Sequence, residues 1–305
     1  MTSEKNISTI LLIGSTGQLG WELKRSLFSL GKLIALDRKS MDLSQPAQIR
    51  EVISQIEPNL IVNAAAYTAV DKAEEEIELA KAINAIAPGV IAEEAEKLQA
   101  PLIHYSTDYV FSGNNGGAPY AEDDNPDPKN VYGQTKLAGE QAIQNVGGPH
   151  LVFRTSWVYG ARGKNFMLTI QRLAKERDTL KIINDQTGAP TWCGSLADAT
   201  GVILKNAKVK TESYSPYLEM VSGTYHMTCA GKTTWFDFDK AILKNTPDHR
   251  QPKIEPIPTS EYPTPASRPQ NSLLSNLKLQ KTFGLKLPDW EEALNQCLDT
   301  SINRQ

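Results

Sequence analysis

A glycine-spaced loop near the start of the chain most constrains the fold. Gly14, Gly17 and Gly20 have the spacing G-x-x-G-x-x-G, and the loop joins the apolar run Thr9–Ile13 to the amphipathic stretch Leu19–Leu30. Such a loop between a first strand and a first helix is typical of dinucleotide binding, because glycines permit a tight turn and let the backbone approach a pyrophosphate. The free N–H groups and positive dipole end of the helix then face the phosphates. We therefore expect a β-α-β unit that holds a dinucleotide.

Strand-like and helical segments alternate through the first half of the chain. The expected strands are 9–13, 32–36, 60–63, 101–106 and 151–155. The expected helices between them are 19–30, 45–55, 71–98 and 131–146. Alternation at this rhythm is typical of a parallel sheet with helices on both faces, so we predict an α/β fold with a doubly wound parallel (Rossmann) sheet.

The pattern loosens after residue 156, which indicates a second, smaller α/β domain that binds the substrate. Its expected elements, with those that return to the first domain, are helices at 165–177 and 195–207 and strands at 181–184 and 223–228. The prolines from Pro252 to Pro269 are expected to break any regular element there. We assign residues 1–156, with segments near 190–230, to the Rossmann domain, and residues 157–189 and 231–305 to the smaller domain.

Composition and charge argue against several classes of function. The formal net charge of -3 speaks against nucleic acid or an anionic membrane surface as the main partner. No apolar run approaches the ~18–20 residues of a membrane span, and the polar start, Met1–Ser8, is expected to be a short disordered leader. The three cysteines are odd in number and widely spaced, so we expect a reducing cytoplasm, no disulfide framework and no catalytic transition metal.

The ends of the next two strands are expected to bind the rest of the cofactor. Asp37 stands where a carboxylate usually accepts from the ribose 2′-OH of NAD, whereas the adjacent Arg38 suits the 2′-phosphate of NADP. Asp37 and Arg38 thus favour different cofactors, and both could instead be solvated turn residues. The small residues after the third strand would let a flat cofactor pass close to the backbone. The expected cofactor-binding residues are Gly14, Thr16, Gly17, Gln18, Leu19, Gly20, Asp37, Arg38, Asp42, Leu43, Ala65, Ala66, Tyr67, Tyr132 and Lys136.

A tyrosine and a lysine four residues apart, Tyr132 and Lys136, turn this nucleotide-binding pattern into a candidate redox site. On a helix that spacing places both side chains on one face. A phenol titrates near pH ~10 unaided, and an ammonium held beside it favours the phenolate and lowers its pKa. The hydroxyl of Thr107, after the fourth strand, would face a substrate beyond the carboxyl ends of the strands. Considered alone, such a hydroxyl is more often a helix cap or turn residue.

Taken together, these residues resemble the extended short-chain dehydrogenase/reductase family. Longer blocks narrow the resemblance to the dTDP-4-dehydrorhamnose reductases within it. The blocks that carry it are G-S-T-G-Q-L-G-W-E-L, V-N-A-A-A-Y-T-A-V-D-K-A-E, Y-S-T-D-Y-V-F-S-G, N-V-Y-G-Q-T-K-L-A-G-E, R-T-S-W-V-Y-G, I-N-D-Q-T-G-A-P-T and Y-P-T-P-A-S-R-P-Q-N-S. They run from residue 14 to residue 272 and so cover nearly the whole chain.

The resemblance implies an enzyme that reduces the C4 ketone of dTDP-4-dehydro-L-rhamnose to dTDP-L-rhamnose with NADPH, or with NADH. It implies that Tyr132 donates the proton, that Lys136 holds the nicotinamide ribose and lowers the tyrosine pKa, and that Thr107 hydrogen-bonds the reacting oxygen. The implied substrate-binding residues are Thr107, Asp108, Trp157, Asn165, Arg268 and Asn271. The last three are assigned to the nucleotide diphosphate by weaker analogy, although a guanidinium suits phosphate oxygens.

Other functions remain open at this point. Nucleotide-sugar dehydratases typically follow the catalytic threonine with Asp-Glu, and here Tyr109 stands in place of the second carboxylate, which favours simple reduction. An epimerase that recycles one cofactor, or a noncatalytic NADP-binding regulatory subunit, is harder to separate, although the tyrosine–lysine pair favours an enzyme. Some relatives bind Mg2+ through carboxylates where subunits meet. Gly194 stands where they can carry an acidic side chain, so we assign no metal ligand and leave Mg2+ and a homodimer undecided.

Overall fold

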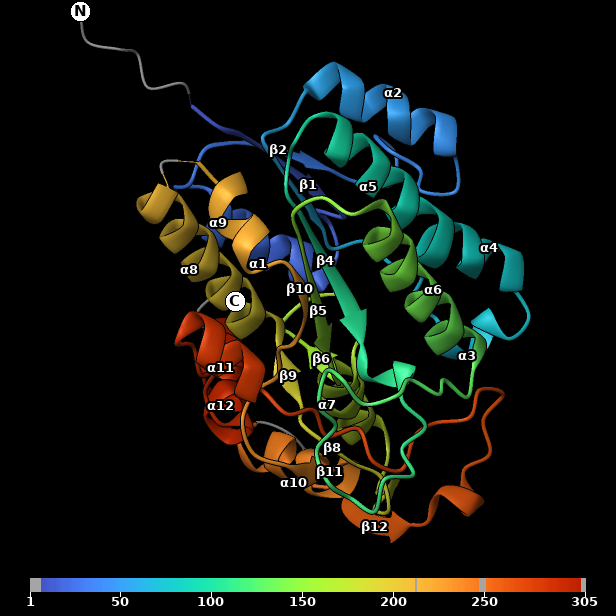
Figure 1. The fold of residues 1–305 in the computed structure, drawn as a ribbon. Helices are drawn as coiled ribbons and strands as arrows, with labels where there is room; N and C mark the ends of the chain where they lie inside the picture. Colours follow the sequence, from blue (N-terminus) through green and yellow to red (C-terminus); the bar gives the residue numbers. More distant parts are fainter. Residues whose placement is uncertain (1–6, 212, 247–250, 303–305) are drawn as a thin grey trace, which may run out of the picture.

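The central sheet positions the rest of the molecule (Figure 1). The computed structural model describes residues 7–211, 213–246 and 251–302, so most of the predicted leader Met1–Ser8 lies outside the described residues. Six strands form this sheet in the order β10-β5-β4-β3-β1-β2, with every pairing parallel. They are β1 (Thr9–Ile13), β2 (Lys32–Leu36), β3 (Leu60–Asn63), β4 (Leu102–Thr107), β5 (His150–Thr155) and β10 (Gly223–His226). The predicted parallel sheet is confirmed.

Helices cover both faces of the sheet. The helices of the two faces are α1 (Gln18–Leu27), α8 (Cys193–Thr211) and α9 (Ser215–Met220) on one, and α2 (Pro46–Ile56), α5 (Ala87–Lys97) and α6 (Val131–Val146) on the other (Figure 1). Along β1, Ile10 and Leu12 pack into the buried cluster of the first face, whereas Leu11 and Ile13 pack into that of the second. Because successive side chains of a strand point to opposite faces, a strand that is apolar throughout requires this double cover.

The segment predicted as one mostly helical run, 71–98, is divided. Two short helices, α3 (Val70–Ala73) and α4 (Ile77–Lys81), precede a π-helical turn, η1 (Ala82–Ile86), which continues directly into α5. Pro88 lies in the first turn of α5, directly after this π-helical turn, where the i→i−5 pattern interrupts the regular hydrogen-bond ladder that a proline cannot join.

Small sheets and further helices lie beyond the carboxyl ends of the central strands (Figure 1). The paired strands are β6 (Val158–Tyr159) with β9 (Thr191–Trp192), β8 (Thr187–Gly188) with β11 (Thr233–Thr234), and β7 (Thr179–Ile183) with β12 (Lys253–Ile257). The helices are α7 (Phe166–Glu176), α10 (Trp235–Lys244), α11 (Leu277–Phe283) and α12 (Trp290–Ile302), with 3-10 turns η2 (Asp108–Val110) and η3 (Thr259–Glu261). None of the helices in the described ranges is both long and apolar enough to cross a bilayer.

The proline-dense stretch is where the prediction of no regular structure is wrong. β12 runs through it and pairs in parallel with β7, with Pro256 opposite Ile182. In a two-stranded sheet each strand has an unpaired edge, so a proline can stand with its missing N–H on the outer side. The predicted strand 181–184 is observed as β7, Thr179–Ile183, and its partner β12 was not predicted because of its prolines.

Candidate active site

The loop after β1 leaves no room for side chains at two of its glycines. Gly14 has φ +83, and a Cβ there would lie 2.7 Å from the backbone nitrogen of Ala65, after β3. A Cβ at Gly20 would overlap the Gly14 carbonyl. α1 begins after Gly17 with no side-chain cap, and Thr16 and Gly17 are exposed. The loop therefore presents backbone N–H groups and the positive end of a helix dipole to an anion, which fits the pyrophosphate of a dinucleotide.

The turn after β2 is held by its own aspartates. Asp37 Oδ1 accepts from the backbone nitrogens of Lys39 at 3.1 Å and Ser40 at 2.9 Å, and these bonds hold the pKa of Asp37 below its usual range. Asp42 accepts from Ser44 in the same way, and its pKa is also lowered. Arg38 is exposed, while Leu43 is buried in the cluster with α2. Asp37 therefore holds this turn, and the same position is compatible with the expected contact to a cofactor ribose.

Tyr132 and Thr107 meet where β4 ends and α6 begins. Asn130 caps α6 by accepting from the Gly133 nitrogen at 2.8 Å. A Cβ at Gly133 would overlap the Tyr109 carbonyl, so glycine is needed for α6 to come this close to η2. The Tyr132 hydroxyl lies beside Thr107, and Thr107 donates to Asp108 Oδ1 at 3.1 Å. Two residues singled out as catalytic and one assigned to the sugar site therefore lie together.

The expected lowering of the tyrosine pKa by Lys136 is wrong for this arrangement. Lys136 Nζ donates to the Tyr105 carbonyl at 2.6 Å and lies 3.1 Å from Nε2 of His104. Burial raises the pKa of Tyr132 to about 12, and the neighbouring Thr107 only partly opposes this. The i,i+4 spacing places both residues on one face, but the lysine amine is bonded to the backbone of β4.

Asp108 is a buried carboxyl beside the tyrosine hydroxyl. It is 2% exposed, and burial raises its pKa to about 6, while Oδ1 accepts from Thr107 and Oδ2 has no partner among the described residues. The ring of Tyr109 meets the Tyr132 ring edge-on, with centroids 5.6 Å apart. Trp157 follows β5, the neighbour of β4, and stacks on Trp235 at 3.6 Å. Polar and aromatic groups thus line the carboxyl edge of β4 and β5.

The three residues assigned to the nucleotide diphosphate have separate partners. Asn165 caps α7, and its amide nitrogen contacts Gln18 Oε1 at 3.2 Å, which places it beside the glycine loop. Arg268 forms two bonds to Asp71, at 3.0 and 2.7 Å. Asn271 donates to Asn115 Oδ1 at 2.6 Å. Each side chain therefore also has a local structural task.

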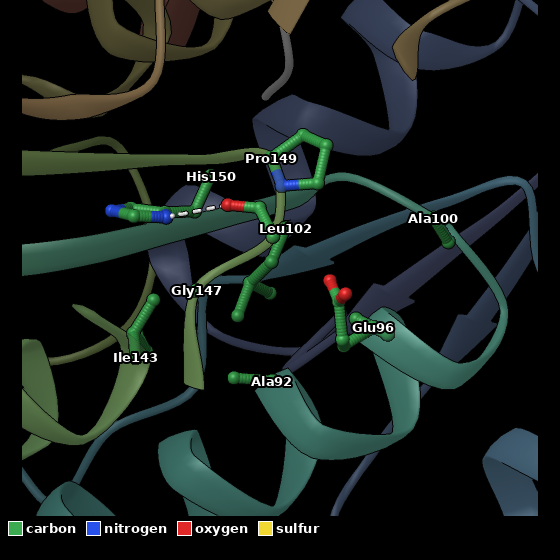
Figure 2. A pocket seen from close by; sticks show the side chains of 10 residues that line it. Ala92, Glu96, Ala100, Leu102, Ile143, Gly147, Pro149 and His150 are labelled. Atoms are coloured by element: carbon green, nitrogen blue, oxygen red, sulfur yellow. Dashed lines mark hydrogen bonds between the residues drawn. The ribbon is translucent and has the colours of Figure 1, made fainter. Parts of the chain in front are cut away.

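A cavity of about 440 Å³ lies beside Asn271. Its lining residues are Gly113, Asn114, Gly116, Gly117, Thr187, Lys232, Gln270, Asn271 and Leu273. Sequence reasoning missed Lys232 and the glycine-rich turn, whose signal is the run S-G-N-N-G-G. Figure 2 shows a second cavity, of about 10 Å³, where β4 and β5 begin, lined among others by Leu102, His150 and Glu96. It lies at the opposite edge of the sheet and has room for about one water.

Sequence reasoning also missed His104 and Asn63, which are buried beside Lys136. His104 Nδ1 lies 3.1 Å from Asn63 Nδ2, and Asn63 Oδ1 accepts from the Ala65 nitrogen at 3.1 Å. Burial first, and the charge of Lys136 second, hold the pKa of His104 well below its usual value. A histidine inside an apolar strand is usually a satisfied core residue, and the sequence carries no signal for the lysine contact.

Comparisons with known proteins agree with this geometry. A family model described as "RmlD substrate binding domain" matches residues 8–303. The dTDP-4-dehydrorhamnose reductase of Escherichia coli (strain K12) is 48% identical over 298 residues, which span 95% of this chain and 97% of the relative. That of Burkholderia thailandensis is 46% identical over 295 residues, again 95% and 97%.

Solved structures give the same result. The dTDP-4-dehydrorhamnose reductase from Bacillus anthracis in complex with NADP has a TM-score of 0.86 at 34% identity, covering 96% of this chain and 99% of that chain. A UDP-glucose 4-epimerase from Thermus thermophilus in complex with NAD, at 18% identity, has a TM-score of 0.78 over 97% of this chain and 100% of its own, and shares the fold alone. The predicted fold class is confirmed.

Proposed function

Since this chain belongs to the dTDP-4-dehydrorhamnose reductase family, as its motifs predicted, we propose that it reduces the C4 ketone of dTDP-4-dehydro-L-rhamnose to dTDP-L-rhamnose with NADPH or NADH. The observation that carries this proposal is the cluster of Tyr132, Thr107 and Asp108 at the same sheet edge as the glycine loop. An acid and a dinucleotide cradle at one edge are what a ketone reductase needs.

The glycine loop supports a nicotinamide dinucleotide as cofactor. A Cβ at Gly14 or Gly20 would overlap the backbone, so both positions require glycine and the start of α1 stays free of side chains there. A relative of 34% identity binds NADP. A bound NADPH or NADH would supply the hydride. Arg38 supports the 2′-phosphate of NADPH and Asp37 the ribose hydroxyl of NADH, so both cofactors stay in the proposal. The other residues proposed to bind it are those predicted on the loop, at the ends of β2 and β3, and on α6.

Tyr132 would act as the acid of the reaction. With a pKa of about 12 it keeps its proton at neutral pH and gives it up when a more basic alkoxide forms beside it. The proton passes from Tyr132 Oη to the C4 oxygen as that oxygen gains charge. Thr107 would bond the reacting oxygen by turning its one hydroxyl proton from Asp108 Oδ1 to that oxygen. Positioning and acid catalysis are thus the contributions of the chain.

The sugar would lie against Asp108 and Trp157, and the nucleotide diphosphate would extend toward Asn271. The cavity beside Asn271, with Lys232 in its lining, supports this direction. Arg268 would reach the diphosphate from its ion pair with Asp71, and Asn165 would act from the glycine-loop side. We retain the two-domain division 1–156 with 190–230, and 157–189 with 231–305, as part of this proposal. A cytoplasmic enzyme completes the proposal, with Mg2+ and a homodimer left undecided as before.

Tyr109 argues for reduction against dehydration. A dehydratase would place a second carboxylate after Asp108, whereas Tyr109 is a half-buried ring packed on Tyr132. An epimerase and a noncatalytic regulatory subunit are the remaining alternatives.

The function is tested by following nicotinamide absorbance. The coupled products of a dehydratase and a 3,5-epimerase serve as substrate, with NADPH and NADH compared. Stoichiometric oxidation of one cofactor and formation of dTDP-L-rhamnose are expected. An interconverted sugar without net oxidation would identify an epimerase. No turnover with either cofactor would contradict a reductase.

A further inference from the structure

Trp157, between β5 and β6, has a backbone conformation that bulky residues rarely adopt. Its φ is +47. The other non-glycine residues with positive φ in the part of the chain that the structure describes, Glu57 and Gln99, are exposed residues at helix ends. A left-handed backbone at a bulky residue is costly and persists only where the surroundings hold it, often at a ligand site. The contacts around Trp157 must therefore keep it in this conformation.

One face of the Trp157 indole is covered by the start of α10. Trp235, the first residue of this helix, stacks on it with ring centroids 3.6 Å apart and planes 9° apart. Trp235 is itself fixed, because its indole N–H donates to Gln186 Oε1 at 3.2 Å and its ring packs on Phe166 at 4.5 Å. A fixed ring on this face limits how far the Trp157 indole can tilt.

The short strand β8 packs against the same indole. A Cβ at Gly188 would lie 2.4 Å from Cε2 of Trp157, so only glycine lets the strand come this close. The backbone is held as well, since the Thr191 nitrogen donates to the Trp157 carbonyl at 3.2 Å. Thr187, the neighbour of Gly188 in β8, lines the cavity beside Asn271. The indole and that cavity are thus linked through β8.

The indole N–H is the polar part of Trp157 that stays open. The side chain is half-buried, and its Nε1 is neither buried nor bonded to an acceptor in residues 7–211, 213–246 and 251–302. An indole N–H can only donate, so it suits a hydroxyl or carbonyl oxygen of a sugar. Because Trp235 covers a face of the ring, a sugar cannot stack there and would meet this N–H instead.

We propose that Trp235 and Gly188 are positioning residues that aim the Trp157 N–H at the sugar of the substrate. This inference rests on the proposed function, in which Trp157 lines the sugar site. β5 carries Trp157 to the carboxyl edge of the sheet, but the contacts from α10 and β8 fix where its indole lies. Two residues that act only through Trp157 thereby determine the affinity for the nucleotide sugar.

Gly188→Ala tests this inference without changing an aromatic ring. Two nearly parallel indoles couple their electronic transitions, so circular dichroism should show an exciton pair of bands that disappears in Trp157→Phe. Gly188→Ala displaces the Trp157 indole and should weaken this signal. The Kd for dTDP-L-rhamnose, measured by calorimetry, and KM for the keto sugar should rise about tenfold, the effect of one lost hydrogen bond. NADPH affinity and kcat at saturating sugar should change little.

Trp235 variants test the stack from the other partner. Trp235→Leu should raise Kd and KM to a similar extent, and Trp235→Phe, which keeps a flat ring on Trp157, should recover most of the loss. Trp290→Phe is the matched control, because Trp290 belongs to the same aromatic cluster and meets Phe238 edge-on at 5.9 Å. It should keep the exciton signal and the wild-type Kd. If Trp235→Leu does not fold, Gly188→Ala and Trp235→Phe still decide the question.

The outcomes separate this inference from the proposed reaction. A variant that loses the exciton signal yet keeps the wild-type Kd and KM would limit Trp235 and Gly188 to core packing and overturn the inference. A wild type that binds dTDP-L-rhamnose but does not turn over the keto sugar would contradict the reductase, and the Kd values of the variants would still decide the inference. A wild type that binds no dTDP-sugar would overturn both.

Discussion

The two sides of the active site are held in place by different means. At the β4–α6 side, backbones approach so closely that Gly133 cannot carry a side chain, and the glycine loop is closed in the same way. The loops around Arg268 and Asn271 are instead held by polar side-chain clamps, Arg268 on Asp71 and Asn271 on Asn115. The first side therefore keeps its geometry through burial and close packing. The second depends on a few partly exposed bonds, each worth about 1 kcal/mol.

The largest stability loss is expected from Glu140→Gln, on the closely packed side. Glu140 and Arg154 are 1% and 5% exposed, so the neutral glutamine leaves Arg154 buried without a counter-charge. The free energy of unfolding should fall by about 3–5 kcal/mol in urea titrations. Glu93→Gln breaks the exposed pair with Arg50 and should cost about 1 kcal/mol or less. Equal losses in the two variants would remove the contrast between buried and exposed contacts.

Gly20→Ala tests the close packing of the cofactor loop. Alanine favours an α-helix over glycine, yet here its Cβ overlaps the Gly14 carbonyl. We expect a loss of about 2–3 kcal/mol in unfolding free energy and weaker NADPH binding, read from cofactor fluorescence. Gly17→Ala, whose Cβ would lie 3.4 Å from the same oxygen, should leave stability nearly unchanged. A fully stable Gly20→Ala variant would show that the loop is not closely packed.

A buried carboxylate on α10, which lies beyond the central sheet, should make the free energy of unfolding depend on pH. Asp239 is 0% exposed, and neither carboxylate oxygen has a hydrogen-bond partner within the part of the chain that the structure describes. Burial raises its pKa to about 7 from 3.8, so the folded state binds an extra proton between these values. Stability should therefore fall as pH rises from 5 to 8, by about 2 kcal/mol more in the wild type than in Asp239→Asn. Asp237→Asn, exposed on the same helix, should follow the wild type; parallel curves for all three would contradict this account.

The smallest effect is expected at the Arg268 clamp. Asp71→Asn and Arg268→Gln break the same ion pair, whose side chains are 41% and 23% exposed, so each should cost about 1 kcal/mol or less in stability. If Arg268 also binds the diphosphate, Arg268→Gln should raise KM for the nucleotide sugar roughly tenfold more than Asp71→Asn does. Equal KM values would restrict Arg268 to holding the loop.

Sequence patterns predicted what local chemistry determines. Apolar runs gave the central strands, and glycine spacing gave the β1–α1 loop, because both depend on neighbours in the chain. β12 was not predicted because it is stabilised by pairing with β7, about 70 residues away, and a stretch rich in prolines gives no sign of that pairing. The position of Lys136 was predicted, but not the contact its long side chain makes with His104. Asn165 and Arg268 were read as ligand contacts, and their bonds to Gln18 and Asp71 required the folded chain.

The most direct test of the central claim is the turnover of Tyr132→Phe with dTDP-4-dehydro-L-rhamnose. This change removes the acidic hydroxyl and leaves the ring that packs on Tyr109. NADPH should bind with unchanged affinity, and kcat should fall by about 10²–10⁴-fold, because the developing alkoxide loses its proton donor. Near-wild-type oxidation of NADPH by the variant would show that Tyr132 is not the acid.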